Sequence, residues 1–175
     1  MDALTAQVTI ERPPAEIYDY LIDIANHPEF CDHFLVDWRL TREDTIGIGA
    51  GARFKISGRD RFAWGDLTIV EAERPRIVTA RGRGGRFNRI RTVYAWTLTP
   101  NATGTTTDVT LEIQRDAQAP FDRMRDALGG RRADQRHWRR ALARLEAIIE
   151  RGERRGERAT VSGGPRKPAT GSPLR

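Results

Sequence analysis

The sequence has little of what several protein classes depend on. Cys31 is the only cysteine, so no intramolecular disulfide can form, and we expect a cytoplasmic protein in a reducing compartment. The chain has no run of 18 apolar residues, and its N-terminus has neither the basic nor the apolar region of a signal peptide, so no transmembrane segment is expected. Gly-x-Ser-x-Gly, His-Glu-x-x-His and phosphate-loop motifs are also absent. Nothing in the sequence requires an enzyme.

Positive charge is concentrated near the C-terminus. The 175 residues carry a net charge of +6, and residues 151–175 hold seven Lys or Arg against two Glu, which leaves +1 for residues 1–150. Nucleic-acid binding needs a basic face on the folded part, so we expect no nucleic-acid partner for the domain itself. We predict a folded domain over residues 1–151 and a basic, disordered tail over 152–175. A regulator that binds protein or nucleic acid through this tail stays an alternative function.

Hydrophobic periodicity predicts a mixed α and β chain. A first strand over 4–11 is ended by Pro13-Pro14, and a helix follows with Ile17, Tyr18 and Leu21 on one face. A short second helix is expected over 28–33, and a helical turn over 121–128. The last helix, 132–151, has an apolar stripe opposite an Arg-rich face. Two-residue alternation predicts the further strands, joined by short turns: 35–40, 52–56, 62–73, 76–81, 89–98 and 106–113.

Two local patterns carry a family resemblance. Pro13-Pro14-Ala15-Glu16-Ile17-Tyr18-Asp19-Tyr20-Leu21 is followed by Asn26-His27-Pro28-Glu29-Phe30, and a Gly-rich turn occurs at Gly47-Ile48-Gly49-Ala50-Gly51-Ala52-Arg53-Phe54. With the order of elements, these resemble the SRPBCC or START-like helix-grip superfamily, which includes bacterial polyketide cyclases/dehydrases and the birch-pollen allergens, over about residues 4–150. The resemblance implies an α+β fold: a curved antiparallel sheet of about seven strands wrapped around a long C-terminal helix, with two short helices after the first strand.

The resemblance also implies a cavity between the sheet and the C-terminal helix. Our first hypothesis is binding or carriage of a small hydrophobic molecule there, such as a lipid, quinone or polyketide. The alternative is an aromatase/cyclase or dehydratase-like enzyme that uses the same cavity. Fold analogy alone names no reaction, no catalytic residue is shared across the superfamily, and the oligomeric state stays open.

Aromatic residues on the strands and the last helix are candidates for the cavity wall. Tyr94 and Trp96 share a sheet face with Thr92 and Leu98, although ordinary core packing is an equally good explanation. His137, Tyr94 and Asp66 are the candidates for proton transfer, and for His137 a place at the solvent edge or in a helix cap is the simpler alternative. The predicted ligand-binding residues are Phe54, Trp64, Tyr94, Trp96, Trp138, Ala141, Leu142 and Leu145.

Three further patterns predict less than they first suggest. His27, Cys31 and His33 lie within seven residues but match no zinc spacing, so we expect no metal, and no cofactor is expected either. The glycines at 47, 49 and 51 precede a strand rather than a helix, so we predict a turn instead of a dinucleotide site. Residues 81–86, Arg-Gly-Arg-Gly-Gly-Arg, are similar to an arginine–glycine RNA-binding segment, but they lie where a hairpin is expected.

Overall fold

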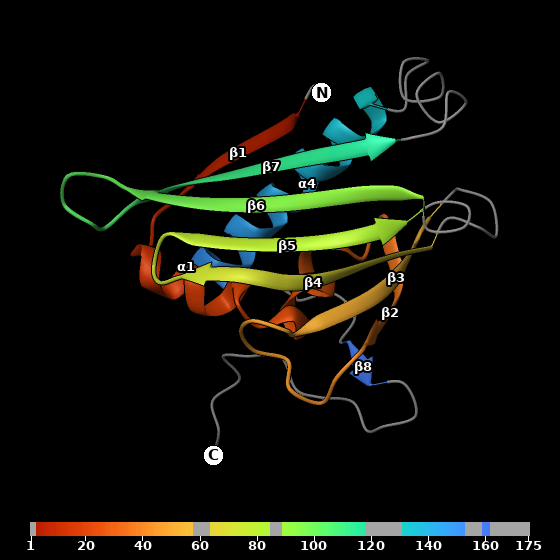
Figure 1. Cartoon of the computed structure of the whole chain (residues 1–175). Helices are drawn as coiled ribbons and strands as arrows, with labels where there is room; N and C mark the ends of the chain where they lie inside the picture. Colours follow the sequence, from red (N-terminus) through yellow and green to blue (C-terminus); the bar gives the residue numbers. More distant parts are fainter. Residues whose placement is uncertain (1–2, 58–63, 85–88, 118–130, 153–158, 162–175) are drawn as a thin grey trace.

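The computed structural model describes residues 3–57, 64–84, 89–117, 131–152 and 159–161. The helical turn expected over 121–128 lies outside these residues, as does most of the predicted C-terminal tail. Figure 1 shows one sheet with the C-terminal helix crossing behind it.

The strands form a single sheet in the order β1-β7-β6-β5-β4-β3-β2-β8. Every neighbouring pair from β1 to β2 is antiparallel, as the short connections predicted, and only β8 pairs in parallel. The expected α+β helix-grip fold is therefore confirmed. The strands are β1 Leu4–Ile10, β2 Leu35–Leu40, β3 Gly51–Ile56, β4 Trp64–Glu73, β5 Ile77–Gly84, β6 Ile90–Pro100, β7 Thr107–Ala117 and β8 Thr160–Val161.

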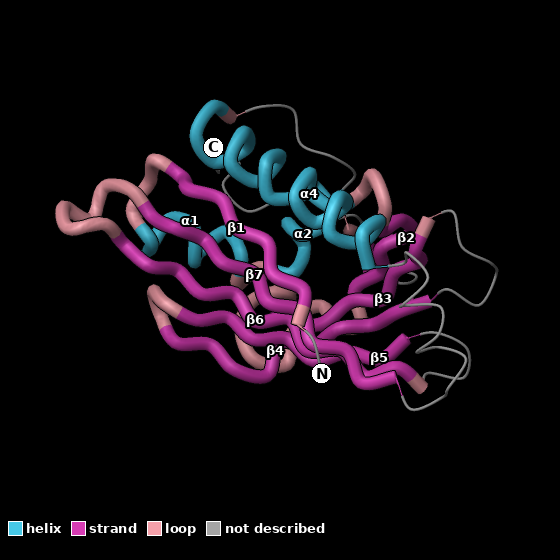
Figure 2. The backbone as a smooth tube through the Cα atoms, turned by 90° about the horizontal axis from the view of Figure 1, so that it is seen from above, coloured by secondary structure: helices cyan, strands magenta, loops and turns pink. Residues whose placement is uncertain are grey.

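The helices gather on one side of the sheet, which we call its inner face (Figure 2). Pro14 begins α1 (Pro14–Leu21), because a proline at the first helical position loses no hydrogen bond. The 3₁₀ turn η1 (Ile24–Asn26) and α2 (His27–Cys31) follow at the Asn-His-Pro sequence. The long helix α4 spans Arg131–Arg151. None of the described helices has the length and apolar content needed to span a membrane.

The core lies between this inner face and the helices. Alternate residues of β7, Val109, Leu111 and Ile113, are at most 2% exposed, while their neighbours Thr110 and Glu112 point to the opposite, outer face. The stripe on α4 is buried against the same core, and it comprises Trp138, Ala141, Leu142, Leu145 and Ile148.

Part of the predicted tail belongs to the sheet. Ala159 is fully buried, and Thr160 and Val161 pair with Arg39 and Leu40 of β2. The predicted solvated extension is therefore wrong for these three residues. The reason is that β2 is otherwise the edge of the sheet, and its free backbone groups offer a place for any nearby strand-forming segment.

The arginine–glycine segment is also part of the sheet. Residues 81–84 lie in β5, where they pair with β4 on one side and β6 on the other. A Cβ atom on Gly82 would lie 1.9 Å from the carbonyl oxygen of Asp66, so only glycine allows β4 and β5 to approach this closely. The described residues of this segment therefore belong to a paired strand, whereas a free RNA-binding segment would be unpaired.

Candidate functional site

Most of the predicted cavity wall is packed into the core. Phe54 and Trp96 are each 2% exposed. Trp38 lies against Phe54 with ring centroids 4.9 Å apart, and the edge of Phe30 meets Trp96 at 6.0 Å. These aromatic rings contact other protein side chains, so they pack as part of the core beneath any binding site. The buried helix residues Ala141, Leu142 and Leu145 take the same role on α4.

Tyr94 differs from these residues, because it lies on the inner face and yet keeps a partly exposed side chain. Its ring centroid is 5.9 Å from that of Trp138 on α4. Trp138 in turn meets Phe34 edge-on at 5.1 Å. Burial of the phenol raises the pKa of Tyr94, so the hydroxyl is protonated near neutral pH and can donate a hydrogen bond. The structure therefore brings together two of the predicted wall residues, Tyr94 and Trp138, at a place where surface is still accessible.

A charged pair lies beside Tyr94 on the inner face. Arg115 of β7 forms an ion pair with Asp134 in the first turn of α4, and their side chains are 25% and 9% exposed. Arg115 is paired in register with Thr92, two residues before Tyr94. This end of the inner face therefore carries a hydroxyl, a phenol and an ion pair, whereas most of the rest of the face is apolar.

Sequence reasoning missed this ion pair, although a signal was present. Arg115 continues the alternation of Val109, Leu111 and Ile113, so it falls on the buried face, where a charge needs a partner. Asp134 precedes Trp138 by one helical turn and so shares its side of the helix. Which acid meets Arg115 depended on how α4 docks, and the sequence does not specify that.

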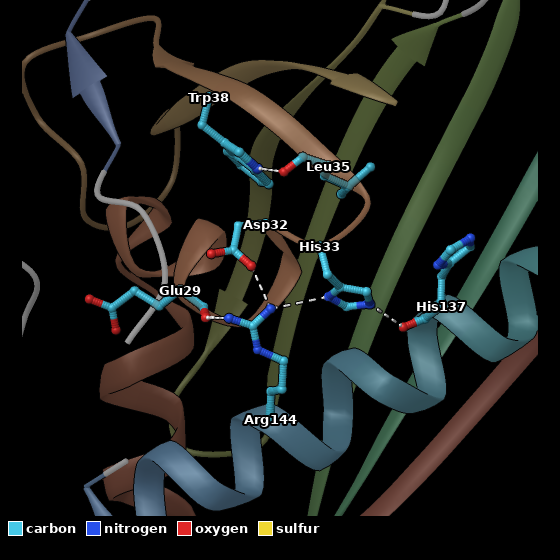
Figure 3. Close-up of polar contacts among 7 residues, drawn as sticks. All are labelled: Glu29, Asp32, His33, Leu35, Trp38, His137 and Arg144. Carbon is cyan, nitrogen blue, oxygen red and sulfur yellow. Dashed lines mark hydrogen bonds and ion pairs between the residues drawn. The ribbon is translucent and has the colours of Figure 1, made fainter. Parts of the chain in front are cut away.

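His137 is placed away from Tyr94. Its ring stacks on Phe34 at 5.0 Å and 11°, so the chain of ring contacts that links it to Tyr94 runs through Phe34 and Trp138. Figure 3 shows the ring of His137 directed away from the polar contacts around Arg144. The proposed proton-transfer pair of His137 and Tyr94 therefore has no direct contact in this arrangement.

Asp66 and Trp64 lie on the outer face. Asp66 pairs in register with the exposed Arg53, and its Oδ1 accepts a hydrogen bond from the backbone N–H of Arg83 at 2.8 Å. Trp64 pairs with Lys55. The next pair along these strands, Phe54 with Gly65, is on the inner face, so Trp64 is on the outer face. Both residues are thus separated by the sheet from Tyr94, which corrects their predicted place in the cavity.

The helix α4 is fastened to α2 by a polar cluster (Figure 3). Arg144 pairs with Asp32, donates to the carbonyl oxygen of Glu29 at 2.9 Å, and donates to Nδ1 of His33 at 3.3 Å. Because Arg144 can only donate, the proton of His33 is on Nε2, which donates to the carbonyl oxygen of His137 at 3.2 Å. Burial lowers the pKa of His33, so the ring is neutral and both its nitrogens are engaged.

His27 has a structural place in the core. Its Nε2 lies 2.8 Å from the carbonyl oxygen of Leu21, and its ring packs against Phe30, Trp38 and Trp96. Burial lowers the pKa of His27 to about 4. In the described part of the chain, no group of three or more His, Cys, Asp or Glu side chains is arranged to hold a metal ion.

Comparison with known proteins agrees with this fold. No curated protein sequence matches the chain. The solution structure of KanY matches with a TM-score of 0.66 at 17% identity, over 85% of this chain and 97% of KanY. Truncated norcoclaurine synthase from Thalictrum flavum matches at 0.63 and 8% identity, over 85% and 92% of the two chains. DynU16, a putative protein in the dynemicin biosynthetic locus, matches at 0.61 and 16% identity, over 91% of this chain and 51% of its own.

At these identities the neighbours establish the fold alone. The sequence profile of one family, described as polyketide cyclase / dehydrase and lipid transport, matches residues 1–150. This range runs from the first strand to the end of the long helix, and so contains Tyr94, Trp138 and the Arg115–Asp134 pair. The chain therefore belongs to the polyketide cyclase / dehydrase and lipid transport family.

Proposed function

We propose that the protein binds a small hydrophobic molecule on the inner face of its sheet, between β6, β7 and α4. The observation that carries this proposal is the accessible surface of Tyr94, a residue with a polar hydroxyl, beside Trp138 on a largely buried face. Trp138 stands beside it as an apolar wall, and the membership of a family of cyclases and lipid-transport proteins supports the same class of ligand.

The polar groups near Tyr94 define what the ligand should carry. Small-molecule sites are mainly apolar with a few polar groups that orient the ligand. The protonated Tyr94 hydroxyl can donate to a carbonyl or hydroxyl oxygen, and the Arg115–Asp134 pair adds a fixed dipole at the same end. A quinone, a polyketide or a lipid with one oxygenated end would match this arrangement.

A cyclase or dehydratase remains the second candidate function. Tyr94 is the residue that favours it, because a phenol kept protonated by burial beside an ion pair can act as a general acid toward a carbonyl oxygen. One structural neighbour, norcoclaurine synthase, is named as an enzyme. The two candidates share the ligand site and differ in whether the bound molecule is changed.

Native mass spectrometry of the protein purified from its own source tests the proposal. We expect an apolar adduct that is released on denaturation and that raises the melting temperature when it is added back, since a ligand of the folded state stabilises it. A bare protein mass, with no stabilisation by lipids, naphthoquinones or aromatic polyketides, would contradict the proposal. Conversion of the added molecule to a new mass would support the enzyme.

A matched pair of variants locates the site. Tyr94→Phe should weaken binding of 1,4-naphthoquinone by about fivefold, the equivalent of one hydrogen bond of about 1 kcal/mol. The neutral, apolar probe N-phenyl-1-naphthylamine should bind this variant as it binds the unmodified protein. Thr97→Ala, on the outer face of the same strand, is the control and should change neither affinity.

A further inference from the structure

The outer face of the sheet carries a groove, most of whose lining residues point away from the inner-face site. It has a volume of about 1060 Å³ and crosses β3 to β7, with the loop before β3 at one end. Six of the described residues that line it are arginines. One of them, Arg115, pairs with Asp134 of α4. We call the other five the outer arginine cluster: Arg42, Arg53, Arg81, Arg83 and Arg91. Asp66 and Asp116 are the two acids in its lining.

The outer arginine cluster contains a pair of like charges that destabilises the sheet. Arg83 of β5 lies directly opposite Arg91 of β6, and like charges placed opposite each other on a sheet destabilise it. Arg91 also lies opposite Asp116 and Arg53 opposite Asp66, so two acids offset part of the positive charge of the five arginines. Among the described residues, no carboxylate lies within ion-pair distance, 4.0 Å, of any arginine of the cluster. By contrast, Arg74, Arg115 and Arg144 each hold a carboxylate. An anionic partner would relieve the repulsion between Arg83 and Arg91.

The residues that line the groove make a small molecule or single-stranded nucleic acid a poor partner. A pocket for a small molecule is mainly apolar and enclosed, whereas this groove is open and lined by polar side chains. Single-stranded nucleic acid is held by stacking on aromatic rings, and none of the described residues that line the groove is aromatic. Arginine forks fit carboxylates through two parallel hydrogen bonds.

Exposed apolar side chains occur in the loop before β3 and on β4, two of the elements that form the groove. Ile46, Ile48 and Val70 are 54%, 68% and 39% exposed. Gly49 lines the groove, and its N–H donates to the carbonyl oxygen of Ile69, which places Ile48 close to Val70. A phosphate backbone makes no use of such residues, but a protein segment that mixes acidic and apolar side chains does.

We propose that this groove binds an extended, acidic segment of a partner protein. The outer arginine cluster contacts the carboxylates of this segment, and Ile48 contacts one of its apolar side chains. The distance from β3 to β7 covers four strand spacings, or about 19 Å, which an extended segment of about six residues spans. This surface lies on the opposite side of the sheet from Tyr94 and does not depend on the proposed ligand.

Fluorescence anisotropy with the full chain tests the proposal. The probe is a fluorescein-labelled peptide of about twelve residues made of Glu-Glu-Leu repeats, which exceeds the span of the groove. Arg83→Gln with Arg91→Gln should weaken binding about tenfold or more and reduce its salt dependence. The melting temperature of this variant should stay about the same, because the repulsion between Arg83 and Arg91 and the attraction between Arg91 and Asp116 are removed together. Arg136→Gln with Arg139→Gln on the exposed side of α4 is the charge-matched control, with an expected change below about twofold.

Two further measurements decide the class of partner. Ile48→Ser should weaken binding of the Glu-Glu-Leu peptide and leave an all-Glu peptide unaffected. A thymidine oligonucleotide of the same length should bind less tightly than the peptide. Equal losses in the groove variant and its control, no effect of Ile48→Ser on the Glu-Glu-Leu peptide, or tighter binding of the oligonucleotide would each overturn the proposal.

Discussion

At the residue scale, burial decides the charge of His27 and His33, the two histidines whose spacing with Cys31 matched no zinc site. His27 donates into the backbone of α1, and His33 bridges Arg144 and the carbonyl oxygen of His137. Burial lowers the pKa of both rings, so both are neutral near pH 7. Their hydrogen bonds hold elements together, so we assign neither ring to the inner-face site around Tyr94.

The buried His27 predicts a loss of stability in mild acid. Its pKa is about 4 in the folded protein and 6.5 without the effect of burial, so between these values the unfolded chain binds a proton that the folded protein does not. The free energy of unfolding should therefore fall as the pH is lowered from 6.5 toward 4, by about 3 kcal/mol from this residue. Urea denaturation followed by tryptophan fluorescence at several pH values measures it.

The control for this prediction is His27→Gln, whose amide can still donate to Leu21 but does not titrate. The pH dependence should become shallower in this variant, with the remainder coming from His33 and the carboxylates. An identical dependence in both proteins would mean that His27 is not the group responsible.

At the element scale, the close approach of β4 and β5 depends on one glycine. A Cβ at Gly82 meets a backbone oxygen at 1.9 Å, whereas a Cβ at Gly84 has its nearest atom, the carbonyl oxygen of Trp64, at 3.1 Å. Gly82→Ala should therefore lower the free energy of unfolding by about 3 kcal/mol or more, and Gly84→Ala by about 1 kcal/mol. Chemical denaturation of the two variants gives the comparison, and equal losses would show that the two strands can separate at Gly82 without cost.

The attachment of α4 to α2 is a second test at this scale. Arg144→Gln removes the ion pair with Asp32 and its bonds to Glu29 and His33. Because the pair is partly exposed, we expect a loss of about 2 kcal/mol in the free energy of unfolding. Arg151→Gln removes ion pairs with Glu146 and Glu150 that are long, at 3.9 and 4.0 Å, and should cost less than about 0.5 kcal/mol.

Thermal or urea denaturation of these two α4 variants measures the difference. A similar small loss for both would mean that the apolar stripe alone holds α4 in place.

At the scale of the whole molecule, the end of the chain contributes to the sheet. A chain that stops at residue 161 keeps β8 and is the reference for this comparison. A chain that stops at residue 158 loses Ala159 and the pairing of Thr160 and Val161 with β2, and its free energy of unfolding should fall by about 1–2 kcal/mol. Denaturation of the two truncated chains gives the result, and equal stability would show that β8 adds nothing measurable.

The charge of the whole molecule is distributed by the sheet as well as by the sequence. Residues 1–150 have a net charge of only +1, which suggested a neutral domain without a charged face. Yet the alternation of the strands brings Arg53, Arg81, Arg83 and Arg91 to one face of the sheet. A net charge averages over both faces and hides such a concentration.

The sequence predicted the strands, the helices and their order closely. The expected strands 35–40 and 52–56 agree with β2 and β3 within a residue, and the last helix agrees with α4 to one residue. The alternation of Leu67 and Ile69 also contained the information that Trp64 and Asp66 point the other way, because their positions are out of phase. The misplacement of these two residues was thus an error of phase rather than of structure class.

What the sequence determined by itself were the local properties: periodicity, turn residues, the Asn-His-Pro break between α1 and α2, and the family that these patterns resemble. Only the tertiary structure decided which distant residues meet. The Arg115–Asp134 pair, the contact of Tyr94 with Trp138 and the opposition of Arg83 and Arg91 all depend on strand register and on the docking of α4. Register and docking are set by the packing of the whole core, so no local pattern contains them.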